Sequence, residues 1–226
     1  MSRIMRNYIL ISMKGELSME TQQTSKPSGV KHLVTDPPFA QTLFGDWRWS
    51  WVWVIVRLYL GYEWIMAGYD KIINPAWVGP QAGTALTGFI NNAITLSTGA
   101  HPSVQGWYAY FLQHTILPGA SVWSYVVAFG ETLVGAGLIL GAFTGIAAFF
   151  GFFMNFNYLM AGSISSNPYL LFLALFIILA WKTAGWWGLD RWILVDLGTP
   201  WSPGLAFRTR RTKGTAAPSA EPSGTD

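Results

Sequence analysis

With 226 residues, the chain is long enough for one bundle of about four membrane-spanning helices and too short for a second, soluble domain as well. Apolar residues make up 51% of it, charged residues 11%, and 13 residues are tryptophan, a composition typical of integral membrane proteins. The chain has no cysteine, which excludes iron–sulfur clusters, covalently attached haem and dithiol relays. The three histidines, His32, His101 and His114, lie outside the apolar segments, so no pair of them is placed to hold a haem between membrane spans. No metal or flavin motif is evident, and no nucleic-acid partner is expected.

The two ends of the chain are polar. Residues 1–45 are mixed in composition, and residues 201–226 combine basic side chains with Ser, Thr, Pro, Gly and Ala. Neither stretch has enough apolar residues to form a core, so both are predicted to be disordered tails.

Residues 46–200 are predicted to form the membrane domain. Four apolar segments of near-bilayer length stand out, at about 49–69, 121–140, 145–160 and 168–183. Short links join the last three segments, which makes them antiparallel neighbours. The sequence thus predicts an all-α integral membrane protein with a four-transmembrane-helix, up-down bundle.

Basic residues gather in the two tails, which predicts that both termini are cytoplasmic. The long link at 70–120 then lies on the outer side. Within it, Gly83 to Leu96 and Val104 to Ile116 have helical patterns, and the second is rich in aromatic residues suited to a membrane surface. We expect an extracytoplasmic helical cap between the first two spans.

Several polar side chains fall inside the predicted spans. A charge at the centre of a bilayer costs roughly 2.5 to 3.5 kcal/mol, so it needs a partner or a function. By distance from the span ends, Arg57, Glu131 and Asn155 all lie near the midplane, which predicts that Arg57 pairs with Glu131. The pair serves either to pin two helices together or to form a functional site. Lys182 lies near a helix end, where its amine reaches the interface.

The first span has a stripe of residues at helical spacing: Arg57, Gly61, Trp64, Gly68 and Lys71. Its glycines permit close helix approach, so this stripe is predicted to face the bundle interior. Glu63 belongs to a nearly opposite stripe, which must be covered by the cap or by another subunit, as in a homo-oligomer.

A pocket bounded by Arg57, Trp64, Glu131 and Asn155 suits a planar lipophilic molecule with carbonyls at both ends, such as a quinone. On the outer side, Lys71 with His101 and His114 can attract a small anion.

Motifs on successive spans resemble those of the DoxX and DoxD membrane proteins: the stripe from Arg57 to Lys71, Glu131 with Gly135, Asn155 with Asn157, and Gly185-x-x-Gly188-Leu189-Asp190-Arg191. The long aromatic outer loop is more similar to DoxD, the membrane subunit of thiosulfate:quinone oxidoreductase.

The resemblance implies a multi-pass protein of a prokaryotic cell membrane that oxidises thiosulfate to tetrathionate and passes the electrons to membrane quinone. It also implies a separate second subunit similar to DoxA. On this basis the expected residues are, for catalysis, Arg57, Glu131 and Glu63; for quinone, Trp64, Asn155 and Asn157; and for the anion, Lys71, His101 and His114.

Two other functions are consistent with the same sequence. A non-catalytic subunit of a respiratory complex, such as a terminal quinol oxidase, would use the second stripe and the glycines at 137, 141 and 145 for packing. A small-solute carrier is less well supported, because the spans show no internal repeat and none is broken at its middle.

Overall fold

The computed structural model describes residues 36–197, and these residues form helices and turns with no strand among them. The all-α prediction is confirmed for this part of the chain. Most of the two predicted disordered tails, at 1–35 and 201–226, falls outside the described residues.

Four long helices coincide with the four apolar segments: α3 (Ser50–Ile72), α6 (Ala120–Leu140), α7 (Thr144–Met160) and α8 (Asn167–Leu179). The last is shorter than expected. The backbone turns at Ala180 (φ −89°, ψ 15°), and a separate turn, α9 (Trp181–Ala184), follows. This turn aims the Thr183 hydroxyl at the Phe44 carbonyl, to which it donates a hydrogen bond of 3.0 Å.

The chain joins the helical body earlier than the predicted tail boundary. Residues expected in the tail form α2 (Pro38–Ala40) and a π turn, η1 (Gln41–Gly45), and a 3-10 turn, η2 (Trp47–Trp49), leads into α3. The Phe44 ring stacks on Trp53 with centroids 5.5 Å apart, so this segment packs against the first long helix.

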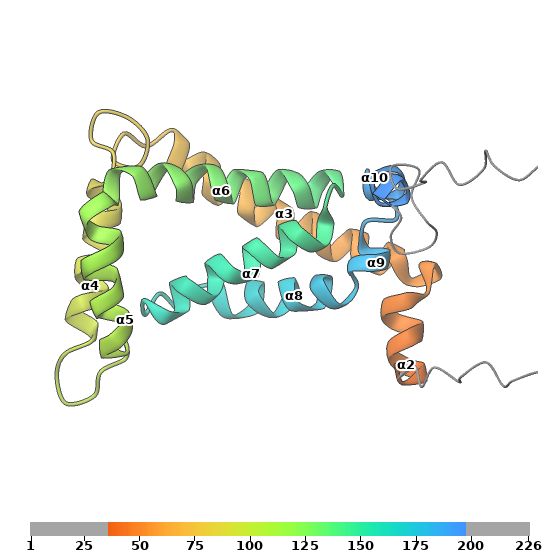
Figure 1. Ribbon diagram of the computed structural model, residues 1–226, viewed down its shortest axis with the longest axis horizontal. Coiled ribbons are helices and arrows are strands. Elements are labelled where there is room, and N and C mark those ends of the chain that lie inside the picture. The colour runs from red at the N-terminus through yellow and green to blue at the C-terminus, as the bar shows by residue number, and fades with distance from the viewer. Residues whose placement is uncertain (1–35, 198–226) are drawn as a thin grey trace, which may run out of the picture. The chain divides into compact units, whose positions relative to one another are not determined.

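The predicted cap is present as two helical segments, α4 (Thr84–Leu96) and α5 (Gly106–Phe111). The second continues through a π turn, η3 (Leu112–Ile116), and a 3-10 turn, η4 (Leu117–Gly119), into α6. Figure 1 shows α4 and α5 crossing one end of the long helices. The cap has its own apolar cluster, which includes Leu86, Ile90, Ala93, Val104 and Tyr108.

Close packing of α3 on α6 depends on glycine. A Cβ built on Gly135 would lie 2.6 Å from the Ile65 nitrogen, and one on Gly68 would lie 2.7 Å from the Thr132 nitrogen. Neither position has room for a side chain, so these glycines set the register between the two helices.

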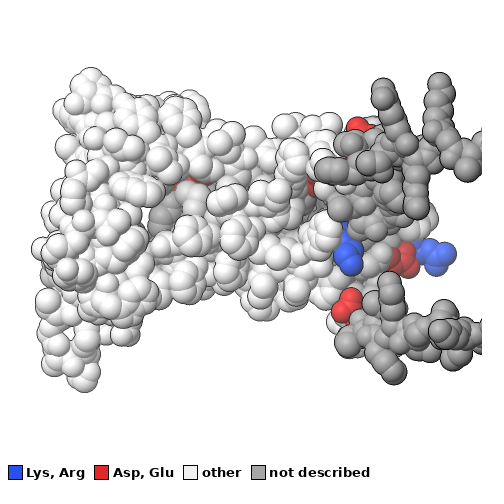
Figure 2. Space-filling model, viewed as in Figure 1, with Lys and Arg blue, Asp and Glu red and all other residues white. Residues whose placement is uncertain are grey.

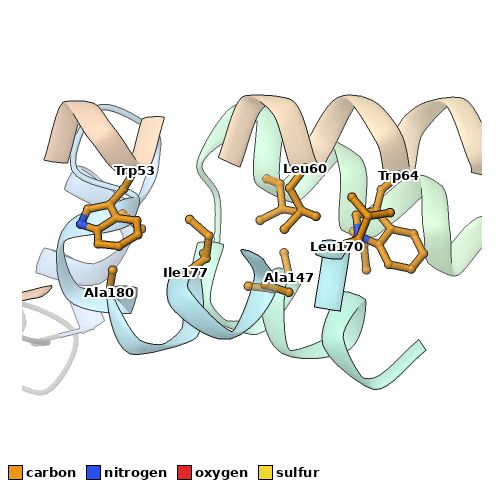
Figure 3. Packing of buried hydrophobic residues seen from close by; sticks show 12 residues of the cluster. Trp53, Leu60, Trp64, Ala147, Leu170, Ile177 and Ala180 are labelled. Atoms are coloured by element: carbon orange, nitrogen blue, oxygen red, sulfur yellow. The ribbon is translucent and has the colours of Figure 1, made fainter. Parts of the chain in front are cut away.

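The other side of α3 carries larger side chains. Figure 3 shows Trp53, Leu60 and Trp64 pointing from α3 toward residues of α7 and α8, among them Ala147 and Ile177. The aromatic face thus meets mostly small and aliphatic side chains, and this cluster forms the main core.

One run in the described residues, Gly106–Leu140, has the length and apolarity of a membrane span. At 23 residues α3 is long enough but carries four charged side chains, and α7 and α8 are shorter. Figure 2 shows that charged side chains are nearly absent from the viewed face between the cap and α10 (Asp190–Leu197). The crossing of the membrane by all four helices stays a prediction.

Candidate functional site

The carboxylate of Glu131, halfway along α6, is the centre of the site. Only 1% of the residue is exposed. Its Oε2 lies 2.7 Å from the Lys71 ammonium, and its Oε1 accepts a hydrogen bond of 2.7 Å from the Tyr158 hydroxyl. A buried carboxylate is thereby held between a cation from α3 and a hydroxyl from α7.

Lys71 occupies the last turn of α3, where the helix leads into the cap. Its ammonium also lies 5.2 Å from the centroid of the Trp77 ring, a cation–π distance, and donates to the Ala67 carbonyl at 3.4 Å. The Lys71 side chain is 20% exposed, whereas that of Glu131 is 1% exposed.

Lys71 and Glu131 line a cavity of about 310 Å³, which we call the acidic cavity. Trp64 and Asn155 also form its wall, and the Trp64 indole Nε1 and the Asn155 amide Nδ2 are both buried without a hydrogen-bond partner in the described part of the chain. Buried donors of this kind are costly unless a ligand or water accepts from them. Glu63 lines the same cavity and is half-buried.

Polar side chains of the turn between α7 and α8 complete the wall, among them Ser163, Ser165 and Ser166. Ser165 is exposed and its two neighbours in the cavity wall are half-buried. The cavity therefore reaches the surface at this turn, with hydroxyl groups at its mouth and Lys71 behind them.

Arg57 does not pair with Glu131, and this sequence-based prediction is wrong. Its guanidinium donates to the carbonyls of Leu138 (2.7 Å) and Ile139 (2.9 Å) near the end of α6, and to the Trp187 carbonyl (3.2 Å). Lys71 lies fourteen residues further along α3, or about 21 Å at 1.5 Å per residue. Because α6 runs antiparallel to α3, Lys71 and not Arg57 comes level with Glu131.

Arg57 instead belongs to a polar cluster at the other end of the helices, built around Asp190. The buried Asp190 carboxylate accepts hydrogen bonds from the backbone nitrogens of Phe143 and Thr144 (2.8 Å for the latter), at the start of α7. Phe143 has a positive φ of 48°, an unfavourable backbone for a bulky residue, and the Asp190 contact stabilises it.

The other sequence-predicted residues lie outside the cavity. His101 is exposed, and His114 stacks on Tyr110 with centroids 4.0 Å apart; neither lines the cavity with Lys71. Asn157 accepts a hydrogen bond of 2.9 Å from the Tyr108 hydroxyl at its side-chain oxygen, and so ties α7 to the cap. Their predicted roles in anion and quinone binding remain predictions.

Sequence reasoning missed three features of the site. Tyr158 carries a usable signal, because it follows Asn155 by three residues and so shares its helix face. Asp190 belongs to the motif from Gly185 to Arg191, but that motif does not indicate that its carboxylate caps a helix. The serines between α7 and α8 had no distinguishing signal, since such residues are common in any turn.

Comparison with known proteins gives one family. The DoxX family model matches residues 52–161, which run from the first turn of α3 to the end of α7. No curated protein and no solved structure matches the chain. The matched segment contains Lys71, Glu131, Asn155 and Tyr158, whereas Asp190 lies beyond it. Residues 52–161 are therefore similar to the membrane-associated DoxX family, and this segment carries most but not all of the residues that line the cavity.

Proposed function

We propose that the protein is a membrane oxidoreductase that reduces quinone in the cavity beside Glu131, with thiosulfate as the electron donor. Two thiosulfates give one tetrathionate and two electrons, and a quinone takes up these electrons with two protons to become a quinol. The observation that carries the proposal is the Lys71–Glu131–Tyr158 arrangement, which places a cation, a buried acid and a hydroxyl on one cavity wall.

The quinone part of the reaction is supported by the unused donors. A volume of about 310 Å³ is near the lower end of small-molecule sites and suits one ring with its substituents. Trp64 and Asn155 line the cavity, and their side-chain N–H groups have no partner among the described residues, whereas quinone carbonyls accept hydrogen bonds and have no donor of their own. Glu131 and Tyr158 then deliver a proton to the reduced oxygen.

The thiosulfate part is supported by the mouth of the cavity. A small dianion entering between Ser163 and Ser166 meets hydroxyl donors first and then the Lys71 ammonium. Arg57 takes no part in this path, because it lies at the other end of α3. Lys71 is therefore shared between the anion and Glu131, and a proton on Glu131 offsets the charge when the anion is bound.

The test uses the purified full-length chain in nanodiscs, and follows thiosulfate-dependent loss of the ultraviolet absorbance of a quinone analogue. We expect wild type to reduce the analogue, Lys71→Met to raise the KM for thiosulfate, and Glu131→Gln to lower kcat by about 10²-fold or more. Lys182→Met and Asp196→Asn are matched controls, because both side chains are exposed and line no part of the cavity. Properly folded wild type that reduces no quinone analogue with thiosulfate would overturn the proposal.

A further inference from the structure

A second, larger hollow lies beside the acidic cavity. Figure 1 shows α6 and α7 diverging from their connecting turn toward the cap. Between them is an apolar groove of about 950 Å³, closed at its wide end by side chains of α4 and α5 such as Ile90 and Tyr108.

The groove is open along its length. Its rim consists of large apolar side chains that are about half exposed or more, among them Leu133 (71%), Ile146 (56%) and Phe150 (52%). Its α6 wall extends from Trp123 to Leu140, about 26 Å at 1.5 Å per residue. Such a groove fits a long, flexible hydrocarbon chain.

Polar groups are confined to one end of the groove. The side chains with oxygen are Tyr108, Asn157 and Tyr158, all at the cap end, while the rest of the wall is apolar. An occupant must therefore have a polar head at the cap and an apolar chain that runs toward the turn between α6 and α7.

The groove adjoins the acidic cavity, because Leu86, Phe89 and Tyr158 line both hollows. Tyr158 is the residue that donates to Glu131. A head group in the acidic cavity is thus one side chain away from the cap end of the groove.

We propose that the groove binds the isoprenoid chain of the quinone whose ring occupies the acidic cavity, so that the substrate is a long-chain quinone that enters sideways from the membrane between α6 and α7. This inference rests on the proposed function. It adds a separate entry route: the anion enters at the polar turn between α7 and α8, and the quinone enters through the groove.

Gly130 offers a way to block the groove alone. It lines the groove but not the acidic cavity, and a Cβ built on it would lie 3.7 Å from the flexible side chain of Met154, an ordinary contact. Gly88→Phe is the matched control, since Gly88 is an exposed helical glycine of α4 with open space around it and lines neither hollow.

The experiment measures binding and not turnover. The full-length protein in quinone-free nanodiscs is titrated with a long-chain isoprenoid quinone and with the same ring lacking its chain. We expect wild type and Gly88→Phe to bind the long-chain form at least tenfold more tightly than the chainless form, and Gly130→Phe to lose this difference. An isoprenoid alcohol without a ring should displace the long-chain quinone from wild type.

Equal affinity of wild type for both quinones, or an unchanged preference in Gly130→Phe, would overturn the inference. The inference would also be overturned if Gly130→Phe lost bound phospholipid, or lost the ability to form a dimer, while its quinone binding stayed unaltered. The groove would then bind a phospholipid or a second copy of the protein. Ala136→Leu, also in the groove, serves if Gly130→Phe does not fold.

The two proposals can fail separately. Suppose that quinone binding depends on the isoprenoid chain but no thiosulfate-dependent reduction is seen. The groove assignment would then stand and the thiosulfate reaction would be removed. Thiosulfate-dependent reduction that does not depend on the isoprenoid chain of the quinone would support the thiosulfate reaction and remove the groove assignment.

Discussion

The Lys71 ammonium lies 2.7 Å from a carboxylate oxygen of Glu131 on the neighbouring helix, and Glu131 is almost fully buried while Lys71 is 20% exposed. The pair is therefore asymmetric. Removing the lysine leaves a charge in an apolar interior, whereas removing the acid leaves a lysine that can still reach water.

This asymmetry gives a first prediction. Lys71→Met should destabilise the protein by about 3 to 5 kcal/mol, because the buried carboxylate loses its partner. Glu131→Gln should lower the free energy of unfolding by a smaller amount. The double variant should recover part of the loss. Thermal unfolding of all four proteins in one detergent gives the coupling energy, and purely additive effects would show that the two groups do not interact.

Tyr158→Phe is predicted to affect turnover more than folding. Loss of a hydrogen bond to a carboxylate costs about 1.5 to 3 kcal/mol of stability, but under the proposed function it also removes a proton donor from the reduction site. We expect kcat to fall about 10²-fold at an unchanged KM for thiosulfate. Tyr62→Phe, at an exposed position that lines neither hollow, should behave like wild type.

Arg57→Met separates a structural role from the catalytic role that the sequence predicted. The guanidinium donates to three carbonyls at the end of α6 and in the Trp187 segment, so its loss should lower stability by about 3 kcal/mol. The kcat of the protein that remains folded should stay within a few-fold of wild type. A loss of turnover without a loss of stability would restore the catalytic assignment.

Asp190→Ala is expected to loosen the start of α7. The carboxylate caps two backbone nitrogens, and an N-cap of this kind contributes about 0.5 to 2 kcal/mol. The midpoint of thermal unfolding should fall, and hydrogen exchange should rise at Phe143 and Thr144. Asp196→Ala removes an exposed acid of the same short helix and should change neither quantity.

The sequence was sufficient for the helices and for the interior stripe of α3. Arg57, Gly61, Trp64 and Gly68 are all buried, as the helical spacing predicted, because periodicity depends only on one helix and its environment. Lys71 follows at the end of the same stripe and faces Glu131.

Partner choice was not predictable by the same means. Depth along each span, counted from the ends of that span, puts Arg57 and Glu131 at one level. The actual register follows from where glycine backbones meet, with Gly61 opposite Gly135 and Gly68 opposite Thr132. That register depends on the surfaces of both helices together, so the residue pattern of a single helix does not predict it.

The contrast between the two faces of α6 has a mechanical consequence. On one face, the glycine contacts with α3 leave no room for adjustment. Two polar contacts, Arg57 with the Leu138 carbonyl near the end of α6 and Lys71 with Glu131 at its middle, resist sliding. On the other face, α7 diverges from a turn that contains Gly141. The α3–α6 pair is therefore the fixed part of the site, and a wider spacing between α6 and α7 would lengthen the distance between the Tyr158 hydroxyl and Glu131.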